Sequence, residues 1–588
     1  MAARRAAAQR APAQRRSPAK GRKAPAQPRA RPRTRTAAAR VAAARITERR
    51  IGLMFAIFLL AIACATLRAG YLVAFKGDSL KTMASTQHVQ EVTLIAKRGT
   101  VTDRHGAELA VSEDAATIFA TPFLIKDPVR VARRLAPILG RDQNKLLEIL
   151  SDRQSGFAYL ARKAEARKGE QIQKLEIEGI GVLDDSRRYY PEGEVAAQVI
   201  GSVGVENKGL TGLEQQLDSE LAGSDGKQRI VRDARGVPVS LDQLADDHAG
   251  TDLRLTLDVP LQDRAEQVLA GVGRTYQPKG ATAIVMDPNT GDVLAMANWP
   301  RIDANKVEDA PAWARLNRAV GFTYEPGSTF KSFTVAGALS ENVVRPDTRF
   351  TIGPEIQVAD RVIKESHGTG GIFTVSDILA RSSNVGAVRV GQRLGERRFD
   401  HWVRNFGFGQ MTDLPLPGES PGIVPKVQNY SGASIGNLPL GQGLAVTPMQ
   451  MVDGYAAIAN GGVLVKPRLR MDEDASEGRR IMSERTSARV RRMLEGVLGP
   501  TGTAPEAAIP GYDIAGKTGT AEKPENGVYS KDKVVASFVG FAPADKPELL
   551  AAVIVDEPKI VHSGGEVAAP AFEKIASFAL PYLGIPPN

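Results

Sequence analysis

The stretch from Tyr324 to Lys331 reads Tyr-Glu-Pro-Gly-Ser-Thr-Phe-Lys and is the most informative part of this chain. Its Pro-Gly pair is a turn that can lead into a helix, and apolar residues follow at roughly helical spacing. Positions three apart lie on one face of a helix, so the hydroxyl of Ser328 and the amine of Lys331 can meet. A serine with a basic group so close is a candidate nucleophile.

The Ser-x-x-Lys spacing is weak evidence by itself. It also occurs in copies that start at Ser17, Ser224 and Ser530. Only the copy at Ser328 follows a Pro-Gly turn, and two further elements come after it in order, Ser382-Ser383-Asn384 and Lys517-Thr518-Gly519-Thr520. The ordered triple resembles the signature of the penicillin-binding protein and serine β-lactamase superfamily, with Ser-Ser-Asn in place of Ser-Asp-Asn.

The first two elements can supply a nucleophile and its base. Serine needs an adjacent base, and lysine can serve when burial and nearby cations depress its pKa. We therefore expect Ser328 to be the nucleophile and Lys331 to take its proton. Ser382 is expected to relay protons, and the amide of Asn384 to hold both Lys331 and a substrate carbonyl.

The third element is expected to be a strand edge that binds substrate. Lys517 adds positive potential, and the hydroxyls of Thr518 and Thr520 can bind a terminal carboxylate. Gly519 has no side chain, which lets the strand approach the nucleophile's helix. The backbone N–H groups of Ser328 and Thr520 are the predicted oxyanion hole.

The same segment also fits a nucleotide-binding motif, since Gly511–Thr518 matches the P-loop pattern G-x-x-x-x-G-K-[ST]. A P-loop must follow a buried strand and open a helix. Residues 503–510 contain two prolines and make a poor central strand, while Gly519 and Pro524 would disrupt the helix. We therefore predict no nucleotide site.

No cofactor or metal is expected. The chain has six histidines, which are scattered, and one cysteine, Cys64, inside an apolar run. These residues form no zinc-type ligand cluster. His367, in a glycine-rich stretch, is interpreted as a loop residue.

Charge is distributed unevenly along the 588 residues, whose formal net charge is +11. Residues 1–50 hold 16 Lys and Arg and one acid, Glu48, so they carry +15 and the rest of the chain carries −4. Nucleic-acid binding is one interpretation of such a tail. Its Ala/Pro/Arg composition favours a disordered segment, and no nucleic acid is expected as a partner.

An uncharged apolar run from Ile51 to Leu67 follows the tail and extends toward Phe75. Its length is at the short end of what spans a bilayer. The positive-inside rule places residues 1–50 in the cytoplasm and residues after about 76 outside. Ala63-Cys64-Ala65 resembles a cleavage site, but secretory signals start nearer the N-terminus, so we expect an uncleaved signal anchor.

Four segments are therefore predicted. They are a disordered basic cytoplasmic tail (1–50), a transmembrane signal anchor (51–75), a pedestal domain (76–250) and a transpeptidase-type domain (251–588). In the last, a hairpin is expected from Ala281 to Ala297, helices at Ser328–Ser340 and Ser376–Leu394, strands at Lys533–Phe541 and Leu549–Val555, and a final helix from Phe572 to Leu583. Helical character is also expected at Leu124–Leu150 and Arg162–Leu175.

Further motifs make the resemblance more specific. They are Asn317-Arg318-Ala319, Ser382–Gly386, Gly441–Pro448, Ala536–Pro543, and, before residue 250, Arg98-Gly99 with Asp103-Arg104 and Gly209–Glu214. Together they resemble the class B penicillin-binding proteins that build the division septum. The resemblance implies an α/β (α+β) fold, with a penicillin-binding transpeptidase domain whose antiparallel sheet is flanked by helices. It also implies a mixed α/β pedestal of the dimerisation type and one N-terminal transmembrane helix.

The resemblance further implies a serine-type D-Ala-D-Ala transpeptidase. Ser328 would attack the D-Ala–D-Ala bond of a stem peptide, and an amine of a neighbouring stem would resolve the acyl-enzyme into a crosslink. The implied partners are stem peptides and nascent glycan, β-lactam antibiotics, a polytopic membrane glycan polymerase and other division proteins. The implied location is the cell membrane at the septum.

Three alternatives stay open from the sequence. The first is the elongation enzyme of the same class. The second is a β-lactamase or a β-lactam sensor, although no device for a deacylating water is evident. The third is a non-catalytic division scaffold, which the intact set of site residues disfavours.

Overall fold

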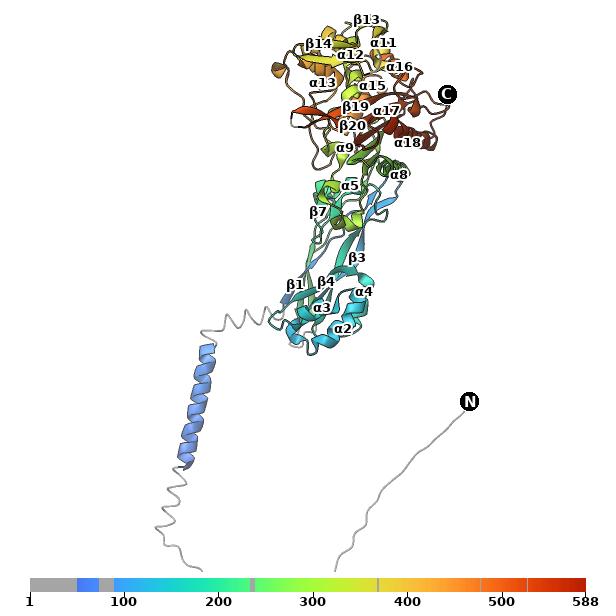
Figure 1. Cartoon of the computed structure of the whole chain (residues 1–588). Helices are drawn as coiled ribbons and strands as arrows, with labels where there is room; N and C mark the ends of the chain where they lie inside the picture. Colours follow the sequence, from blue (N-terminus) through green and yellow to red (C-terminus); the bar gives the residue numbers. More distant parts are fainter. Residues whose placement is uncertain are drawn as a thin grey trace, which may run out of the picture. The chain divides into compact units, whose positions relative to one another are not determined.

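A computed structural model of the chain describes residues 50–72, 89–232, 238–366, 370–475, 477–525 and 527–587 (Figure 1). The chain divides into two compact units, residues 1–90 with 231–239 and residues 91–230 with 240–588. The first unit contains a 23-residue helix from Arg50 to Leu72, which is long and apolar enough to cross a membrane and has no buried residue. This helix fits a single-pass anchor. The predicted disordered tail and His367 lie outside the described residues.

The second unit begins with a five-stranded sheet centred on one long strand, β3 (Glu108–Ala120). Strands β2 (Val101–Thr102), β4 (Ala158–Glu165) and β5 (Ile180–Tyr189) each pair with β3. All three pairings are antiparallel. Strand β10 (Leu253–Arg254) lies parallel to β2 and connects this region to the next.

Three helices cover the far end of this sheet around a small separate core. They are α2 (Pro128–Leu139), α3 (Gln143–Ser151) and α4 (Ala166–Gln173), with the 3-10 turn η1 (Pro122–Leu124) before them. The sequence sets the bounds of α2, because Asp127 caps its first turn and Gly140 ends it in the left-handed conformation. Leu135, Leu146 and Ile118 are among the fully buried residues of this core.

Short elements complete this region. They are β1 (Val89–Leu94), α5 (Ala197–Ile200), β6 (Ser202–Val203), β7 (Gly209–Thr211), α6 (Gly212–Gln216), α7 (Asp218–Leu221), β8 (Gly226–Arg232) and β9 (Pro238–Ala245). Helices α6 and α7 contribute acids to a buried charge cluster. In it Glu214 pairs with Arg98 at 2.8 Å and with Arg188 at 2.5 Å, and Asp218 pairs with Arg98 at 2.7 Å.

A second five-stranded antiparallel sheet dominates the remainder of the chain. Its order is β12 (Val293–Trp299), β11 (Gly280–Met286), β21 (Leu549–Asp556), β20 (Val528–Ala542) and β19 (Ala515–Glu525). Strands from the two ends of the region thus lie side by side, and β19, which carries Lys517, lies at one edge.

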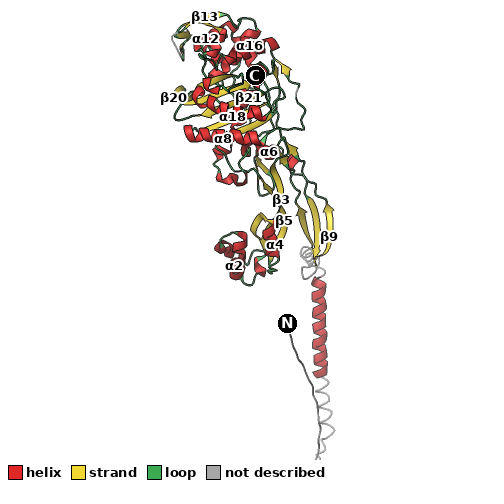
Figure 2. Ribbon diagram, turned by 90° about the vertical axis from the view of Figure 1, so that its right-hand side faces the viewer, coloured by secondary structure: helices red, strands yellow, loops and turns green. Residues whose placement is uncertain are grey.

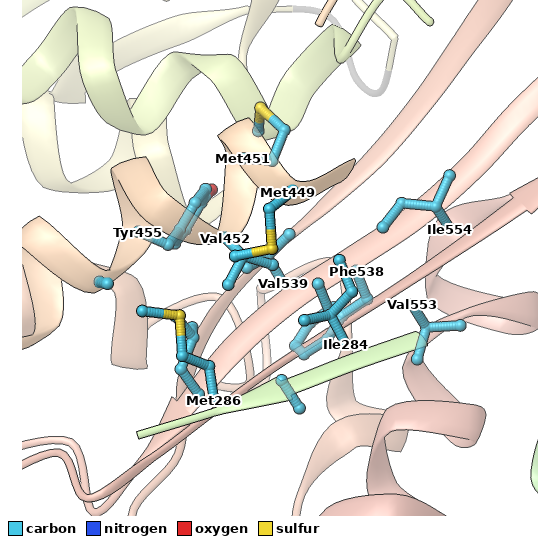
Figure 3. Close-up of a cluster of buried hydrophobic side chains, with 14 of the residues drawn as sticks. Ile284, Met286, Met449, Met451, Val452, Tyr455, Phe538, Val539, Val553 and Ile554 are labelled. Atoms are coloured by element: carbon cyan, nitrogen blue, oxygen red, sulfur yellow. The ribbon is translucent and has the colours of Figure 1, made fainter. Parts of the chain in front are cut away.

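Helices cover both faces of this sheet. Helices α8 (Val259–Tyr276) and α18 (Ala569–Tyr582) lie side by side, as Figures 1 and 2 show, and pack on β12 and β21. Helix α15 (Pro448–Ala459) packs against the sheet with its own apolar residues. Figure 3 shows Met449 and Val452 of α15 lying against Val539 of β20. The sheet is therefore buried between helical layers.

The remaining elements make up the rest of this region, which is mainly helical. Its helices are α9 (Arg318–Gly321), α10 (Lys331–Ser340), α11 (Val375–Ala380), α12 (Asn384–Leu394), α13 (Glu396–Asn405), α14 (Ser434–Asn437), α16 (Glu484–Glu495) and α17 (Gly564–Val567). Its 3-10 turns are η2 (Ala304–Asp309), η3 (Ala312–Arg315), η4 (Gly327–Phe330), η5 (Val427–Asn429), η6 (Leu438–Leu440) and η7 (Pro505–Ala507). Its short strand pairs are β13 (Arg349–Ile352) with β16 (Gly371–Thr374), β14 (Glu355–Val358) with β15 (Arg361–Lys364), and β17 (Val463–Leu464) with β18 (Arg479–Arg480).

The predicted α/β architecture is confirmed, as are the hairpin, the C-terminal strand pair and the final helix. Helical character over Arg162–Leu175 was only partly right, because its first residues extend β4 along β3. Helix Ser376–Leu394 is interrupted at residues 381–383. The P-loop alternative is excluded, because Lys517 and Thr518 lie within a strand and no helix follows them.

Candidate active site

Ser328 lies in the turn η4, which leads directly into the buried helix α10. Gly327 before it has a φ of +55°, a left-handed conformation that glycine adopts without a Cβ penalty. A Cβ at this position would also lie 3.2 Å from the carbonyl oxygen of Thr520. The turn therefore places Ser328 beside strand β19.

Tyr455 stabilises the turn η4 through hydrogen bonds of its hydroxyl. It is fully buried on α15, and its hydroxyl donates a hydrogen bond to the carbonyl oxygen of Thr329 at 2.8 Å. The same hydroxyl lies 2.8 Å from Oγ of Ser332. The sequence analysis missed Tyr455, because a tyrosine in an apolar helix looks like any other core residue.

Lys331 is fully buried one helical turn after Ser328. Its Nζ donates hydrogen bonds to Oδ1 of Asn384 at 2.7 Å, to the carbonyl oxygen of Ser382 at 2.5 Å, and more weakly to Oγ of Ser382 at 3.3 Å. Burial lowers the pKa of Lys331 to about 7, against the opposing effect of the Glu365 carboxylate. At neutral pH a substantial fraction of this amine is therefore unprotonated and able to accept a proton.

The loop between α11 and α12 presents Ser382 and Asn384 to Lys331. Ser382 has a φ of +59°, an unusual conformation for a residue with a side chain. Ser383 caps α12, because its Oγ accepts a hydrogen bond from the N–H of Gly386 at 2.9 Å. This cap is why the predicted single helix is interrupted here.

Glu365 also holds the loop between α11 and α12 in place. The sequence analysis did not identify this residue. Its Oε1 accepts hydrogen bonds from Oγ of Ser383 at 2.7 Å and from the N–H of Val385 at 2.6 Å. The neighbouring Ser366 accepts one from Nδ2 of Asn384 at 2.8 Å. No local pattern marks an acid in this loop segment, so only the tertiary structure reveals its role.

Lys517 lies fully buried on the edge strand β19. Its Nζ donates long hydrogen bonds to the carbonyl oxygen and Oγ1 of Thr518, at 3.2 and 3.3 Å. Burial, together with the nearby charge of Lys331, lowers the pKa of Lys517 well below its ordinary value. The two lysines therefore belong to one electrostatic site.

The other residues of the third element line the same strand. Oγ1 of Thr518 lies 2.6 Å from Oγ1 of Thr503, and Oγ1 of Thr520 accepts a hydrogen bond from the N–H of Gly564 at 3.0 Å. A Cβ on Gly519 would lie 2.4 Å from Oγ of Ser537 and 3.0 Å from the carbonyl oxygen of Pro326. Glycine is thus needed for the close approach of β19 to the turn that carries Ser328, as its motif predicts.

The structure therefore gathers the residues of all three sequence elements around Ser328 and Lys331. This arrangement can activate a hydroxyl through a partly neutral amine, with backbone N–H groups and positive potential nearby. Within the described residues, no three His, Cys, Asp or Glu side chains are grouped so as to hold a metal ion.

Two protein-family descriptions match the chain. The penicillin-binding protein transpeptidase domain matches residues 281–577, and the penicillin-binding protein dimerisation domain matches residues 93–255. The first match covers half of the chain and includes every residue of the candidate site.

Characterised relatives match over nearly the whole length. Stage V sporulation protein D of Bacillus subtilis is 33% identical over 541 residues, covering 89% of this chain and 84% of the relative. Peptidoglycan D,D-transpeptidase FtsI of Escherichia coli is 32% identical over 546 residues, covering 92% of each protein.

Solved structures agree. Penicillin-binding protein 3 of Mycobacterium tuberculosis in complex with aztreonam superposes with a TM-score of 0.66 at 30% identity, covering 84% of this chain and 98% of that one. An ampicillin complex of the same protein also has a TM-score of 0.66. Together with the site geometry, these matches show that the chain belongs to the class B penicillin-binding proteins and is a peptidoglycan D,D-transpeptidase.

Proposed function

We propose that this protein crosslinks septal peptidoglycan through an acyl-enzyme formed on Ser328. The observation that carries the proposal is the buried Lys331, whose pKa lies near 7 and whose amine is held by Ser382 and Asn384 one helical turn from Ser328. A base prepared in this way is what a serine nucleophile requires.

Acylation begins when Oγ of Ser328 attacks the carbonyl carbon of the penultimate D-Ala and Lys331 takes the hydroxyl proton. The resulting oxyanion lies toward the backbone N–H groups of Ser328 and Thr520. The peptide C–N bond then breaks, and the proton passes through Ser382 to the departing amine of the terminal D-Ala. The products are an ester on Ser328 and free D-Ala.

Crosslinking reverses these roles. The amine of a neighbouring stem peptide attacks the ester and loses a proton to the lysine and serine relay, and the proton returns to Oγ of Ser328 as the ester bond breaks. During both steps Asn384 holds the substrate carbonyl and Lys331. During acylation the hydroxyls of Thr518 and Thr520, near Lys517, hold the carboxylate of the terminal D-Ala, which then leaves with it, while Gly519 keeps β19 close to the nucleophile.

The proposed setting is the division septum. The helix Arg50–Leu72 anchors the chain in the cell membrane, with residues 1–49 in the cytoplasm and the transpeptidase outside. A polytopic membrane glycan polymerase supplies the nascent glycan, and other division proteins complete the complex. The family motifs favour division, and the elongation-type role is the second candidate.

Labelling with a fluorescent penicillin tests the chemistry. Wild-type protein is expected to take up a covalent label that is released slowly, and Ser328→Ala is expected to take up none. Rapid release would indicate a β-lactamase, and a folded wild-type protein without label would indicate a scaffold. Depletion in cells tests the setting, because filamentation with uncut septa supports division and rounding supports elongation.

A further inference from the structure

A basic groove lies between α8 and α18, outside the active site. Its volume is about 550 Å³, and it is lined from both helices and by the end of α17. Residues Arg264, Gln267, Gly271 and Arg274 contribute from successive turns of α8 and therefore share one helix face. Lys574 contributes from α18.

The residues that line this groove carry positive charges that no acid in the lining neutralises. Four cations line it (Arg264, Arg274, Arg301 and Lys574), and none of the described residues that line it is an acid. Arg301 is paired with Asp263 and Glu266 at 3.2 and 3.0 Å. Arg264 donates hydrogen bonds to the carbonyl oxygen of Lys574 and lies over the ring of Phe578. In the described part of the chain, none of Arg264, Arg274 and Lys574 has a carboxylate partner. Such a cluster attracts an anionic ligand.

Gly271 on α8 lies where the groove is open. Glycine weakens a helix interior, so a buried contact usually explains its presence. Gly273 has such a reason, because a Cβ there would lie 2.2 Å from the indole of Trp299. At Gly271 a Cβ would meet nothing within 4 Å. The surface of α8 at Gly271 is therefore open to the groove, and a large side chain placed there would fill it.

The groove is also connected to the substrate strand. Val567, which lines it, is the last residue of α17, and Gly564 is the first. The N–H of Gly564 donates to Oγ1 of Thr520, and a Cβ on Gly564 would lie 2.3 Å from the carbonyl oxygen of Gly519. One short helix therefore separates the groove from the strand that carries Thr518 and Thr520.

We propose that this groove binds a second, carboxylate-bearing stem peptide of the glycan strand while the first occupies the catalytic cleft. Arginine forks bind carboxylates in a bidentate manner, and three unpaired cations suit a peptide with several carboxylates. The inference rests on the assignment of peptidoglycan as substrate. It adds a holding site that would keep the enzyme on a strand between crosslinking events.

The test uses the full chain in detergent, with Ser328 already acylated by penicillin so that the cleft is filled. Binding of fluorescent, uncrosslinked glycan strands is measured by anisotropy, both with their stem peptides and after an amidase has removed them. We expect the wild type to bind peptide-bearing strands at least tenfold more tightly than peptide-free strands, and more weakly as salt increases.

Variants locate the site. The double variant Arg274→Gln with Lys574→Gln, and separately Gly271→Phe, are expected to bind at least tenfold more weakly. Gly271→Ala, which leaves the groove open, and Arg397→Gln, an exposed arginine on α13, are the matched controls and should bind like the wild type. Thermal melting identifies any variant that fails to fold. If Gly271→Phe fails to fold, the double variant Arg274→Gln with Lys574→Gln, which changes only surface residues, decides the outcome.

Equal binding by the double variant and the wild type would overturn the proposal. Equal binding of peptide-free and peptide-bearing strands by the wild type would also overturn it, because the glycan alone would then be recognised. So would a phosphate polymer that displaces the strands more strongly than free stem peptides do. Failure of penicillin to acylate Ser328 is a different result, because it contradicts the proposed catalytic mechanism rather than the groove.

Discussion

Two buried charge clusters in this protein differ in the balance between their acidic and basic side chains. In the pedestal region, Arg98 and Arg188 share the carboxylate of Glu214, and Asp218 adds a second acid. In the active site, Lys331 and Lys517 are both fully buried, and the acid that affects Lys331 is Glu365. The first cluster is balanced in charge and the second is not.

The two clusters differ in the type of their basic residues as well as in their charge balance. Arginine does not lose its proton in proteins, so a buried arginine must be paired, and pairing ties distant segments together. Lysine can shed its proton when burial makes the charged form costly. The balanced cluster therefore suits a stabilising role, and the unbalanced cluster lowers the pKa of Lys331, as its proposed role as the base requires. Four predictions test this contrast.

The largest effect is expected for Lys331→Met, which keeps the length of the side chain and removes the base. The rate of acylation by penicillin should fall by roughly 10²–10⁴-fold, the usual contribution of a positioned acid or base. Stopped-flow labelling of the detergent-solubilised chain measures it. The thermal unfolding midpoint reports on folding, and a variant that folds yet acylates like the wild type would contradict the role of Lys331.

The pedestal counterpart is Glu214→Gln, which leaves two buried guanidinium groups without their shared carboxylate. We expect the free energy of unfolding to fall by about 3–5 kcal/mol, as for a broken buried ion pair. Glu113→Gln is the matched control, because Glu113 pairs with the half-exposed Arg187 at 2.6 Å. That change should cost about 1 kcal/mol or less. Equal losses in both variants would mean that burial of the cluster is unimportant.

The pH dependence of acylation should report the lowered pKa of Lys331. The base works only when neutral, so the rate should rise about tenfold per pH unit below the pKa near 7 and level off above it. Lys517 faces Lys331, so the midpoint belongs to the coupled pair. Acylation rates from pH 5.5 to 9 provide the test. A rate still rising steeply at pH 9 would show that burial does not depress the pKa of Lys331.

A smaller effect is expected for Glu365→Gln. The glutamine oxygen can still accept the hydrogen bonds from Ser383 and Val385, but the negative charge that raises the pKa of Lys331 is lost. The midpoint of the pH profile should therefore move to lower pH, while the plateau rate changes less than about tenfold. Ser383→Ala, which removes a hydrogen bond and no charge, should leave the midpoint in place. A midpoint that moves upward in Glu365→Gln would be the contrary result.

Much of the site was predictable because its signals are local. The i, i+3 spacing of Ser328 and Lys331, the Pro-Gly turn before them and the glycine in the Lys517 element reflect short-range geometry. The copy of the motif at Ser530 shows the limit of such spacing, since it lies in strand β20, where residues three apart point to opposite faces. Glu365 and Tyr455 were not predictable, because their roles come from contacts with segments distant in the sequence.

The amino-acid sequence alone predicts the apolar N-terminal helix, the order of the three motif elements, the sheet hairpins and the family resemblance. These depend on composition and on spacing over a few residues. Three features are visible only in the folded protein: Lys331 is buried deeply enough to lower its pKa, Ser382 adopts a left-handed conformation, and Glu214 lies between two arginines. Burial and long-range pairing depend on how the whole chain packs, and no local pattern records that packing.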